Sequence, residues 1–437
     1  MSPLRSLEEA GAAMPDRRRV LLCLGAAACA LSSGVASVWA AAPANEEGNV
    51  ARAPASDKTQ ERQPFYGIHQ SGVTTPRPAT GMVAAFEVLA SSPADLVRLF
   101  ETLTARIAFL TQGGAPPVLD PQLPPADSGI LGPEVFPDNL TVTVSLGVSM
   151  FDQRFGLAEQ RPLHLVRMMS FRNDALDAAR CHGDLSLQIC SNTADTNNHA
   201  LRDIVKMMPD LLLLRWMQEG SVPVIPASPG VPAESARNFL GFRDGSANPD
   251  ATDEALMNRV VWVGAEQEGE PVWTRGGTYQ AVRIIRNFVE RWDRTPLQEQ
   301  ELIFGRRKAS GAPLSGGTEA DVPDFAADPE GEITPLDAHI RLANPRDDKS
   351  KINLIMRRPF NYMNGVTSAG QLNQGLLFIA YQNNLQLGFI TVQQSLDGEP
   401  LEEYIKPVGG GFFFALPGAV DNRDFLGRGL LAAAGFV

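Results

Sequence analysis

Cysteine and histidine are both scarce in this chain of 437 residues, which holds four cysteines and five histidines. Cys23 and Cys29 lie in the first 42 residues, and only Cys181 and Cys190 follow. The segment between this second pair alternates polar and apolar residues, which predicts a strand. Nine extended residues span about 30 Å, far more than the ~7 Å that a disulfide allows between Cα atoms. We therefore expect two free thiols, with no role as metal ligands.

The histidines are too scattered for a site that needs several imidazoles. No two of them have the i, i+4 spacing, or the accompanying cysteine pairs, of a zinc site. His182 follows Cys181 directly, and without a partner ligand we interpret it as structural. A multi-histidine metal centre is therefore not expected.

Phosphate-binding glycine loops and an excess of positive charge are also lacking. The glycine run Gly409–Gly411 leads into an apolar strand instead of a helix, which disfavours nicotinamide and ATP enzymes. The formal net charge is −12, and it becomes −13 without residues 1–42, which carry four basic and three acidic residues. Nucleic acid and anionic membranes are therefore not expected as partners.

Three segments that are present could together bind a haem. Asp244 lies on a glycine-rich turn, His339 follows 95 residues later, and Arg357 comes after a mainly apolar run that would carry it inward. Iron porphyrin needs one axial ligand from the protein and an open opposite face, and His339 can be that ligand. Peroxide cleavage needs a group that moves a proton and a fixed positive charge, which Asp244 and Arg357 can supply.

Each of these residues also has an ordinary structural interpretation. A histidine such as His339 can be satisfied by backbone hydrogen bonds in a core. Asp244 precedes a glycine, a common pair in turns, and the loop resembles a calcium loop without its bidentate glutamate. Arg357 and Arg358 could be surface charges, although strand alternation would point one of them inward. On its own, the turn interpretation of Asp244 is the stronger one.

Taken together, the motifs make the chain resemble the dye-decolorizing-type haem peroxidases, and among them the exported Efe-type deferrochelatase/peroxidases of bacterial iron uptake. The resemblance covers nearly all of the chain after the leader, and the Gly-x-x-Asp-Gly pattern at 241–245 is its most diagnostic part. The other segments that carry it are 63–67, 109–114, 181–184, 246–249, 339–346 and 409–411.

The resemblance implies one haem b per subunit and a role for each motif residue. His339 would be the proximal iron ligand, Asp244 the distal acid/base and Arg357 the distal arginine. A carboxylate usually supports the proximal histidine in this family, and our candidate is Glu403. Some relatives place an asparagine two residues after the distal arginine, where this chain has Pro359. The residues expected to line the haem are Gly245, Ser246, Ala247, Asn344, Pro345 and Arg346.

The amino end predicts export. Arg17, Arg18 and Arg19 precede a weakly apolar stretch rich in small residues, which is typical of a twin-arginine signal peptide over residues 1–42. A membrane anchor is the alternative, because about 20 apolar residues can span a bilayer. The small residues near Ala40 favour cleavage, so a periplasmic location is expected.

The rest of the chain predicts a duplicated α+β fold. Strands over 82–89 and 277–288 are each followed by a helix, over 93–109 and 296–304, and each half then has a later strand, over 185–190 and 376–381. This pattern resembles two ferredoxin-like α/β-sandwich halves in a dimeric α+β-barrel-like arrangement. The expected domains are a disordered linker at 43–63, a first half at 64–221, a Pro-rich linker at 222–232 and a haem-binding half at 233–437.

Three functions follow from a bound haem. The first is oxidation of bulky reductants with hydrogen peroxide, and the second is deferrochelation, which removes iron and leaves the porphyrin intact. The third is a haem carrier without turnover, which would not need Asp244 beside Arg357. We expect a deferrochelatase/peroxidase. By family analogy alone, a homodimer, a ferrous iron permease and a periplasmic iron-binding protein would be its partners.

Overall fold

The computed structural model describes residues 57–223, 225 and 234–437. The expected signal peptide at 1–42 and residues 43–56 of the expected linker lie outside the described residues. So do residues 224 and 226–233, which include most of the Pro-rich linker predicted at 222–232. Among the residues that the structure describes, none of the helices combines the length and the apolar character that a membrane span requires.

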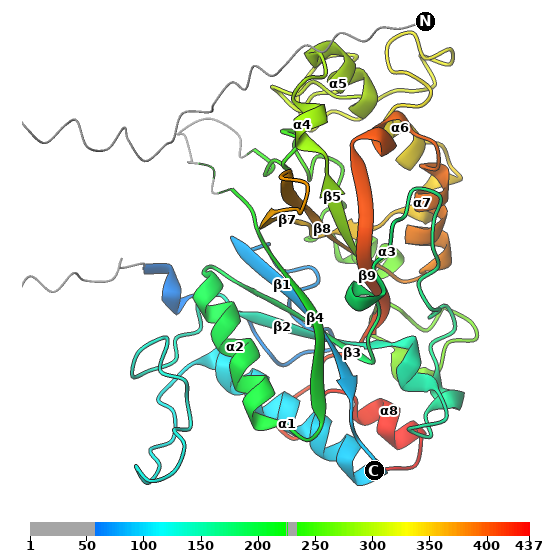
Figure 1. The fold of residues 1–437 in the computed structure, drawn as a ribbon. Coiled ribbons are helices and arrows are strands. Elements are labelled where there is room, and N and C mark those ends of the chain that lie inside the picture. Colours follow the sequence, from blue (N-terminus) through cyan, green and yellow to red (C-terminus); the bar gives the residue numbers. More distant parts are fainter. Residues whose placement is uncertain (1–56, 224, 226–233) are drawn as a thin grey trace, which may run out of the picture. The chain divides into compact units, whose positions relative to one another are not determined.

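The first half of the described chain has a βαββαβ order (Figure 1). Its strands pair antiparallel in the order β2-β3-β1-β4, which is the ferredoxin-like arrangement. The elements are β1 (Thr80–Val88), α1 (Pro93–Gln112), β2 (Thr141–Gly147), β3 (Leu185–Ser191), α2 (Ala194–Met207) and β4 (Leu212–Ser221).

The second half repeats this order with shorter helices. Its strands pair in the order β9-β5-β8-β7, and the short β6 continues along β8. The strands are β5 (Thr278–Asn287), β6 (Met356–Arg357), β7 (Phe360–Val366), β8 (Leu372–Gln382) and β9 (Ile405–Ala415). The helices are α3 (Glu254–Val260), α4 (Val289–Trp292), α5 (Leu297–Phe304), α6 (His339–Ala343), α7 (Thr391–Ser395) and α8 (Arg428–Ala433).

The two halves join into one closed antiparallel sheet. β2 pairs with β9, β4 pairs with β7, and β5 pairs with β8, so the strand order returns to its start. Closure removes the open edges that a strand pair would otherwise expose. The fold predicted from the sequence, two ferredoxin-like halves in an α+β barrel, is confirmed.

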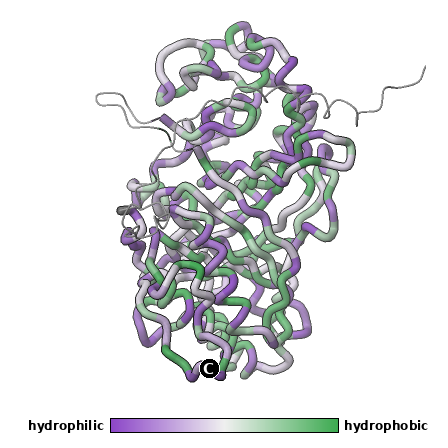
Figure 2. Tube along the Cα trace, turned by 60° about the vertical axis from the view of Figure 1, so that its left-hand side comes forward, coloured by the Kyte–Doolittle hydropathy of each residue, from purple (hydrophilic) through white to green (hydrophobic). Residues whose placement is uncertain are grey.

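Helix α1 shows why the first half is compact. Ser92 caps its first turn through a hydrogen bond that the backbone N–H of Asp95 donates to Oγ at 3.2 Å, and Pro93 occupies the first position. Apolar residues recur at helical spacing and pack with α2 against the sheet (Figure 1). Along the chain, hydrophobic and hydrophilic residues alternate as expected of elements that bury one face (Figure 2). The buried apolar residues of α1 are Leu96, Leu99, Phe100, Leu103, Ile107 and Leu110.

Two expectations about smaller features have different outcomes. Cys181 and Cys190 are both buried and free, as predicted. The prediction of disorder over 43–63 is wrong for residues 57–63. They include a short 3₁₀ helix at Asp57–Gln60, and the carbonyls of Thr59 and Glu61 accept hydrogen bonds from the backbone at 138 and 139. These bonds hold the segment although its composition is polar.

Candidate functional site: a cavity with a histidine–glutamate pair and an aspartate–arginine pair

The second half contains a cavity between the outer face of its sheet and its short helices. Strand β5 contributes Ile285, β8 contributes Phe378, and the residues on either side of α7 contribute Phe389 and Leu396. These walls are largely apolar, which suits a large planar ligand. Asn173 also lines the cavity, and it comes from a loop of the first half. The site therefore needs both halves of the fold.

His339 lies at the first position of α6 and lines this cavity. Its Nδ1 lies 2.6 Å from Oε2 of Glu399, whose side chain is 3% exposed. Burial by itself lowers the pKa of His339, but the charge and the hydrogen bond of Glu399 more than offset it, so the pKa is raised above its ordinary value of 6.5. With Nδ1 held by Glu399, Nε2 is the nitrogen left to bind a ligand, and Glu399 raises its basicity.

The proposal of Glu403 as the carboxylate partner of His339 is wrong. The Glu403 side chain is 61% exposed and faces Arg291 at 3.7 Å. Residues Pro400–Glu403 form a 3₁₀ helix, in which side chains four positions apart do not share a face. Glu399, immediately before this helix, is the one directed at His339.

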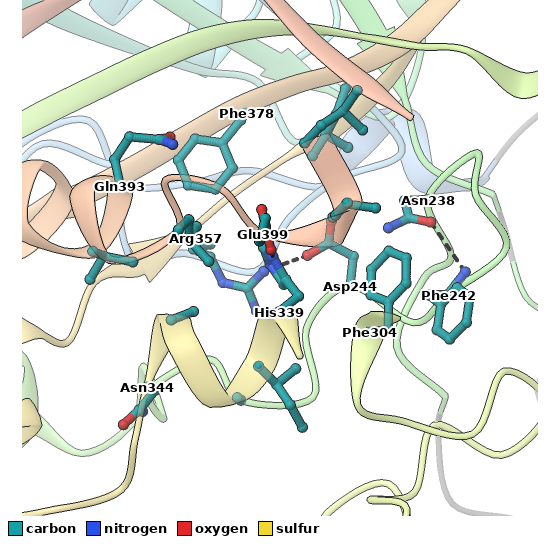
Figure 3. Close-up of a pocket in the computed structure, with 18 of the residues that line it drawn as sticks. Asn238, Phe242, Asp244, Phe304, His339, Asn344, Arg357, Phe378, Gln393 and Glu399 are labelled. Carbon is teal, nitrogen blue, oxygen red and sulfur yellow. Dashed lines mark hydrogen bonds and ion pairs between the residues drawn. The ribbon is translucent and has the colours of Figure 1, made fainter. Parts of the chain in front are cut away.

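Asp244 and Arg357 form an ion pair in the same cavity. Nη1 of Arg357 donates to Oδ1 of Asp244 at 2.6 Å, and the two side chains are 27% and 10% exposed. Their charges also act on His339, Arg357 lowering its pKa and Asp244 raising it, so the three groups are electrostatic neighbours. Figure 3 shows their side chains converging, with Arg357 and Asp244 joined by a dashed line. The structure thus brings together the three residues that the motifs singled out.

The loop that carries Asp244 is fastened to the long segment after α5. Glu319 accepts hydrogen bonds from Arg243 and, at 2.9 Å, from Oγ of Ser246. The backbone N–H of Asp244 also donates to Ala236 at 2.9 Å. Asp244 therefore lies on a turn, and this turn presents its carboxylate to the cavity.

Four of the six residues expected to line the haem line the cavity. They are Ser246, Ala247, Asn344 and Arg346. Gly245 has no side chain to offer, and an added Cβ would meet Oγ of Ser235 at 3.0 Å. Pro345 is exposed and is not part of the lining among the described residues.

A polar end of the cavity holds two arginines, of which only Arg346 was expected. Arg346 has φ +64°, and its buried Nε has no hydrogen-bond partner among the described residues. Burial lowers the pKa of Arg346, and burial together with the charge of Arg346 lowers that of Arg306. An anionic group would relieve both costs.

A haem fits this set of residues. The two carboxylates of a haem would match the arginine end, its ring would match the apolar walls, and Nε2 of His339 could ligate its iron. No cluster of histidine, cysteine and carboxylate side chains that could hold a bare metal ion occurs in the described parts of the chain. Sequence reasoning missed Glu399, Arg306 and Asn173. Their positions in the sequence gave no sign that these three residues converge on one cavity. For Glu399, the acidic segment 397–403 showed only the region in which a carboxylate partner of His339 lies.

Known proteins resemble this chain over almost its whole length. Family models described as "Dyp-type peroxidase, N-terminal" and "Dyp-type peroxidase, C-terminal" match residues 70–221 and 235–420. Proteins named deferrochelatase from Escherichia coli strain K12 and Shigella flexneri serotype 5b are each 55% identical over 426 residues, which are 97% of this chain and 99% of theirs.

Solved structures agree with these relatives. Ferric DtpA from Streptomyces lividans is 33% identical with a TM-score of 0.76, and the match covers 87% of this chain and 100% of that one. A DyP-type peroxidase from Cellulomonas bogoriensis is 32% identical with a TM-score of 0.75, covering 86% of this chain and 99% of the other. With the fold, the cavity and its His339–Glu399 and Asp244–Arg357 pairs, these matches show that the chain belongs to the Dyp-type peroxidase family.

Proposed function

We propose that this protein is a haem-b-dependent deferrochelatase and peroxidase with one haem per subunit. One observation carries the proposal: a histidine backed by a buried carboxylate shares an apolar cavity with an aspartate–arginine pair. The relatives named deferrochelatase support the iron-releasing activity, because their resemblance covers 97% of this chain. The solved DyP-type peroxidases support the peroxide activity.

His339 would hold the cofactor and Glu399 would orient the imidazole. When bound, haem supplies a redox-active iron with one face open to hydrogen peroxide. Glu399 would accept a hydrogen bond from the Nδ1–H of His339, which sets the tautomer and makes Nε2 a stronger ligand. Arg306 and Arg346 would pair with the carboxylates of the ring.

Asp244 and Arg357 would act on hydrogen peroxide in the cavity. Asp244 could accept a proton from one peroxide oxygen and return it to the other, which would leave as water, and the bound haem would supply the two electrons that this cleavage requires. The guanidinium of Arg357 stabilises the negative charge that develops meanwhile, and it cannot neutralise as a lysine could. The ion pair with Asp244 at 2.6 Å holds both groups in position before peroxide arrives.

The same carboxyl group suits iron release. Two protons must replace the iron on the pyrrole nitrogens if the ring is to stay intact, and a protonated Asp244 could deliver one of them. Haem and hydrogen peroxide would both be substrates of one cavity. A haem carrier without turnover is the weaker alternative, because it would not need an arginine fixed beside an acid.

We also propose that the chain acts in the periplasm. The twin-arginine pattern at 17–19 is the support, since that route exports folded proteins with their cofactor bound. A homodimer, a ferrous iron permease and a periplasmic iron-binding protein remain proposals from family analogy. Fractionation of cells that produce the full chain, compared with a variant in which Arg17, Arg18 and Arg19 are lysines, would test the export route.

The decisive experiment follows every product of added haem. Purified protein is incubated with excess haem, with and without peroxide or a reductant, and free protoporphyrin, released iron and ring-cleavage products are measured together by mass spectrometry. We expect intact porphyrin and iron in equal amounts, and Asp244→Asn should lose this release while retaining haem. Peroxide turnover of Asp244→Asn should fall by about 10²–10⁴-fold. Unchanged haem with rapid dye oxidation would leave a plain dye-decolorizing peroxidase, and neither activity would leave a carrier.

A further inference from the structure

Strand β6, which carries Arg357, is only two residues long and has β8 on one side alone. The backbone N–H of Arg358 donates to Ile379 of β8 at 2.8 Å. Because successive residues of a strand direct their N–H and C=O groups to opposite sides, those of Arg357 point away from β8. A second strand would normally pair with them there.

The side chain of Asn248 takes the place of that strand. Its Nδ2 donates to the carbonyl of Arg357 at 2.8 Å, and its Oδ1 accepts from the backbone N–H of Arg357 at 2.8 Å. A carboxamide has the same donor and acceptor pair as a peptide group, so one asparagine can satisfy both backbone groups. Neither a serine nor an aspartate could do so in the same geometry.

Asn248 is also part of the loop that carries Asp244. Its backbone N–H donates to Gly245 at 3.0 Å, which closes a tight turn between the two residues. The loop therefore meets Arg357 twice, through the Asp244 carboxylate at the side chain and through the Asn248 carboxamide at the backbone. Two attachments fix an orientation that a single ion pair would leave free to swing.

We infer that Asn248 is a positioning residue, which holds the backbone of Arg357 in register with Asp244 so that acid and guanidinium face the same point of the cavity. This inference rests on the proposed function, since it concerns the same aspartate–arginine pair. Asn248 itself would not touch the peroxide. Its effect would pass through Arg357, for which a displacement of about 1 Å can cost about 100-fold in rate.

The first test needs no haem. Hydrogen exchange of the apoprotein, resolved to single amides by mass spectrometry, would compare Asn248→Ala with the parent chain. We expect the Arg357 amide to exchange at least about fivefold faster, the factor that one lost hydrogen bond typically represents. The Arg358 amide, bonded to Ile379, should be unchanged and serves as the internal control. Equal exchange of the Arg357 amide in both proteins would overturn the inference.

The second test uses the haem-loaded enzyme. Asn248→Ala should retain haem and its affinity for a dye reductant, while the bimolecular reaction with peroxide slows by about 10–100-fold in stopped-flow measurements. Asn383→Ala is the matched control, because the Asn383 side chain also donates to a backbone carbonyl, but to that of Arg259 at 2.8 Å and not to that of Arg357. It should react with peroxide like the parent chain.

Asn248→Asp keeps the inference testable if the alanine variant does not fold. A carboxylate can still accept from the Arg357 N–H but cannot donate to its carbonyl. We expect protection of the Arg357 amide to persist and the peroxide step to slow to an intermediate extent. Parent-like kinetics in every folded Asn248 variant would refute the positioning role. A parent protein that binds haem without reacting with peroxide would refute the proposed function instead.

Discussion

The two halves of this protein have the same strand order but cover their sheets differently. In the first half, α1 is a continuous helix of 20 residues that packs with α2 on the sheet. In the second half, the corresponding region is divided between α4, with 4 residues, and α5, with 8 residues, and a long irregular segment follows before α6. The sheet face that α1 closes in one half is open to the cavity in the other.

The comparison shows where a duplicated fold can acquire chemistry. A long amphipathic helix buries its apolar stripe against the sheet and leaves a solid core. Short helices and loops leave apolar sheet residues such as Phe378 to contact a ligand, and they place polar side chains at the rim. The helices α1 and α2 of the first half therefore belong to a large buried core, whereas most of the residues that line the cavity come from the second half.

The largest effect that we expect is the loss of haem binding when His339 is removed from the second half. We expect His339→Ala to lose stable haem binding, because no second histidine lines the cavity among the described residues. His199→Ala, in α2 of the first half, should keep haem even if it costs stability. The Soret absorbance after gel filtration would measure retention, and haem held at full strength in His339→Ala would disprove the ligand assignment.

Truncating Phe100 tests the first half. Phe100 is fully buried in α1, so Phe100→Ala should lower the free energy of unfolding by about 3–5 kcal/mol. Phe304→Ala is the counterpart in the second half, where the ring stacks on Phe242 with centroids 4.0 Å apart beside the cavity. Compared with Phe100→Ala, it should lower the free energy of unfolding of the apoprotein less and weaken haem binding more. Urea unfolding with haem titration would measure both, and equal losses in the two variants would contradict a division between core and site.

Substitution of two glutamates, one at a time, tests which carboxylate supports His339. Glu399→Gln should weaken haem binding by about 10–100-fold, because the His339 ring loses the carboxylate that raises its basicity. It should also lower the pKa of His339, since Glu399 is what raises it. Glu403→Gln, four residues later and exposed, is the matched control and should bind haem normally. Competition with a second haem-binding protein would rank the affinities, and the reverse order would restore Glu403 as the partner.

The smallest effect concerns the start of α1. The hydrogen bond from Arg98, with others from Ser91 and Ser92, lowers the pKa of Asp95 from 3.8 to about 2. A lowered pKa in the folded state contributes stability above pH 3.8 that is lost as the pH falls toward 2. Asp95→Asn should therefore melt lower than the parent near pH 6, with a difference that shrinks toward pH 3.

The control for this prediction is Glu101→Gln, an exposed carboxylate on the same helix. As an exposed surface substitution away from the cap, it should melt close to the parent near pH 6. The two halves also differ in helix capping: Ser92 caps α1 through its side chain, whereas α5 begins without a side-chain cap. A constant difference between Asp95→Asn and the parent across this pH range would disprove the role of the carboxylate charge.

Local patterns predicted much of the fold. The strand predicted at 82–89 is β1, the one at 277–288 is β5, and the helix predicted from Pro93 is α1. These elements have strong periodicity, because each buries one face or both. Helix ends were less accurate: α1 continues three residues beyond the predicted Phe109 and stops at Gly113, with φ +74°. The segment at 57–63 was missed because backbone hydrogen bonds to a distant loop, and not its composition, hold it in place.

Local sequence patterns were enough to predict the duplicated α+β architecture, the free thiols and the motif residues Asp244, His339 and Arg357. Periodicity and short motifs are local properties, and they can be recognised without knowing which segments meet. The contact of Glu399 with His339 and that of Asn248 with the backbone of Arg357 could be recognised in the folded structure alone. The first contact joins residues that are 60 positions apart in the sequence, and the second joins residues that are 109 positions apart. Such contacts depend on the paths of loops and on which side of a strand faces its neighbour, and neither of these leaves a local pattern in the sequence.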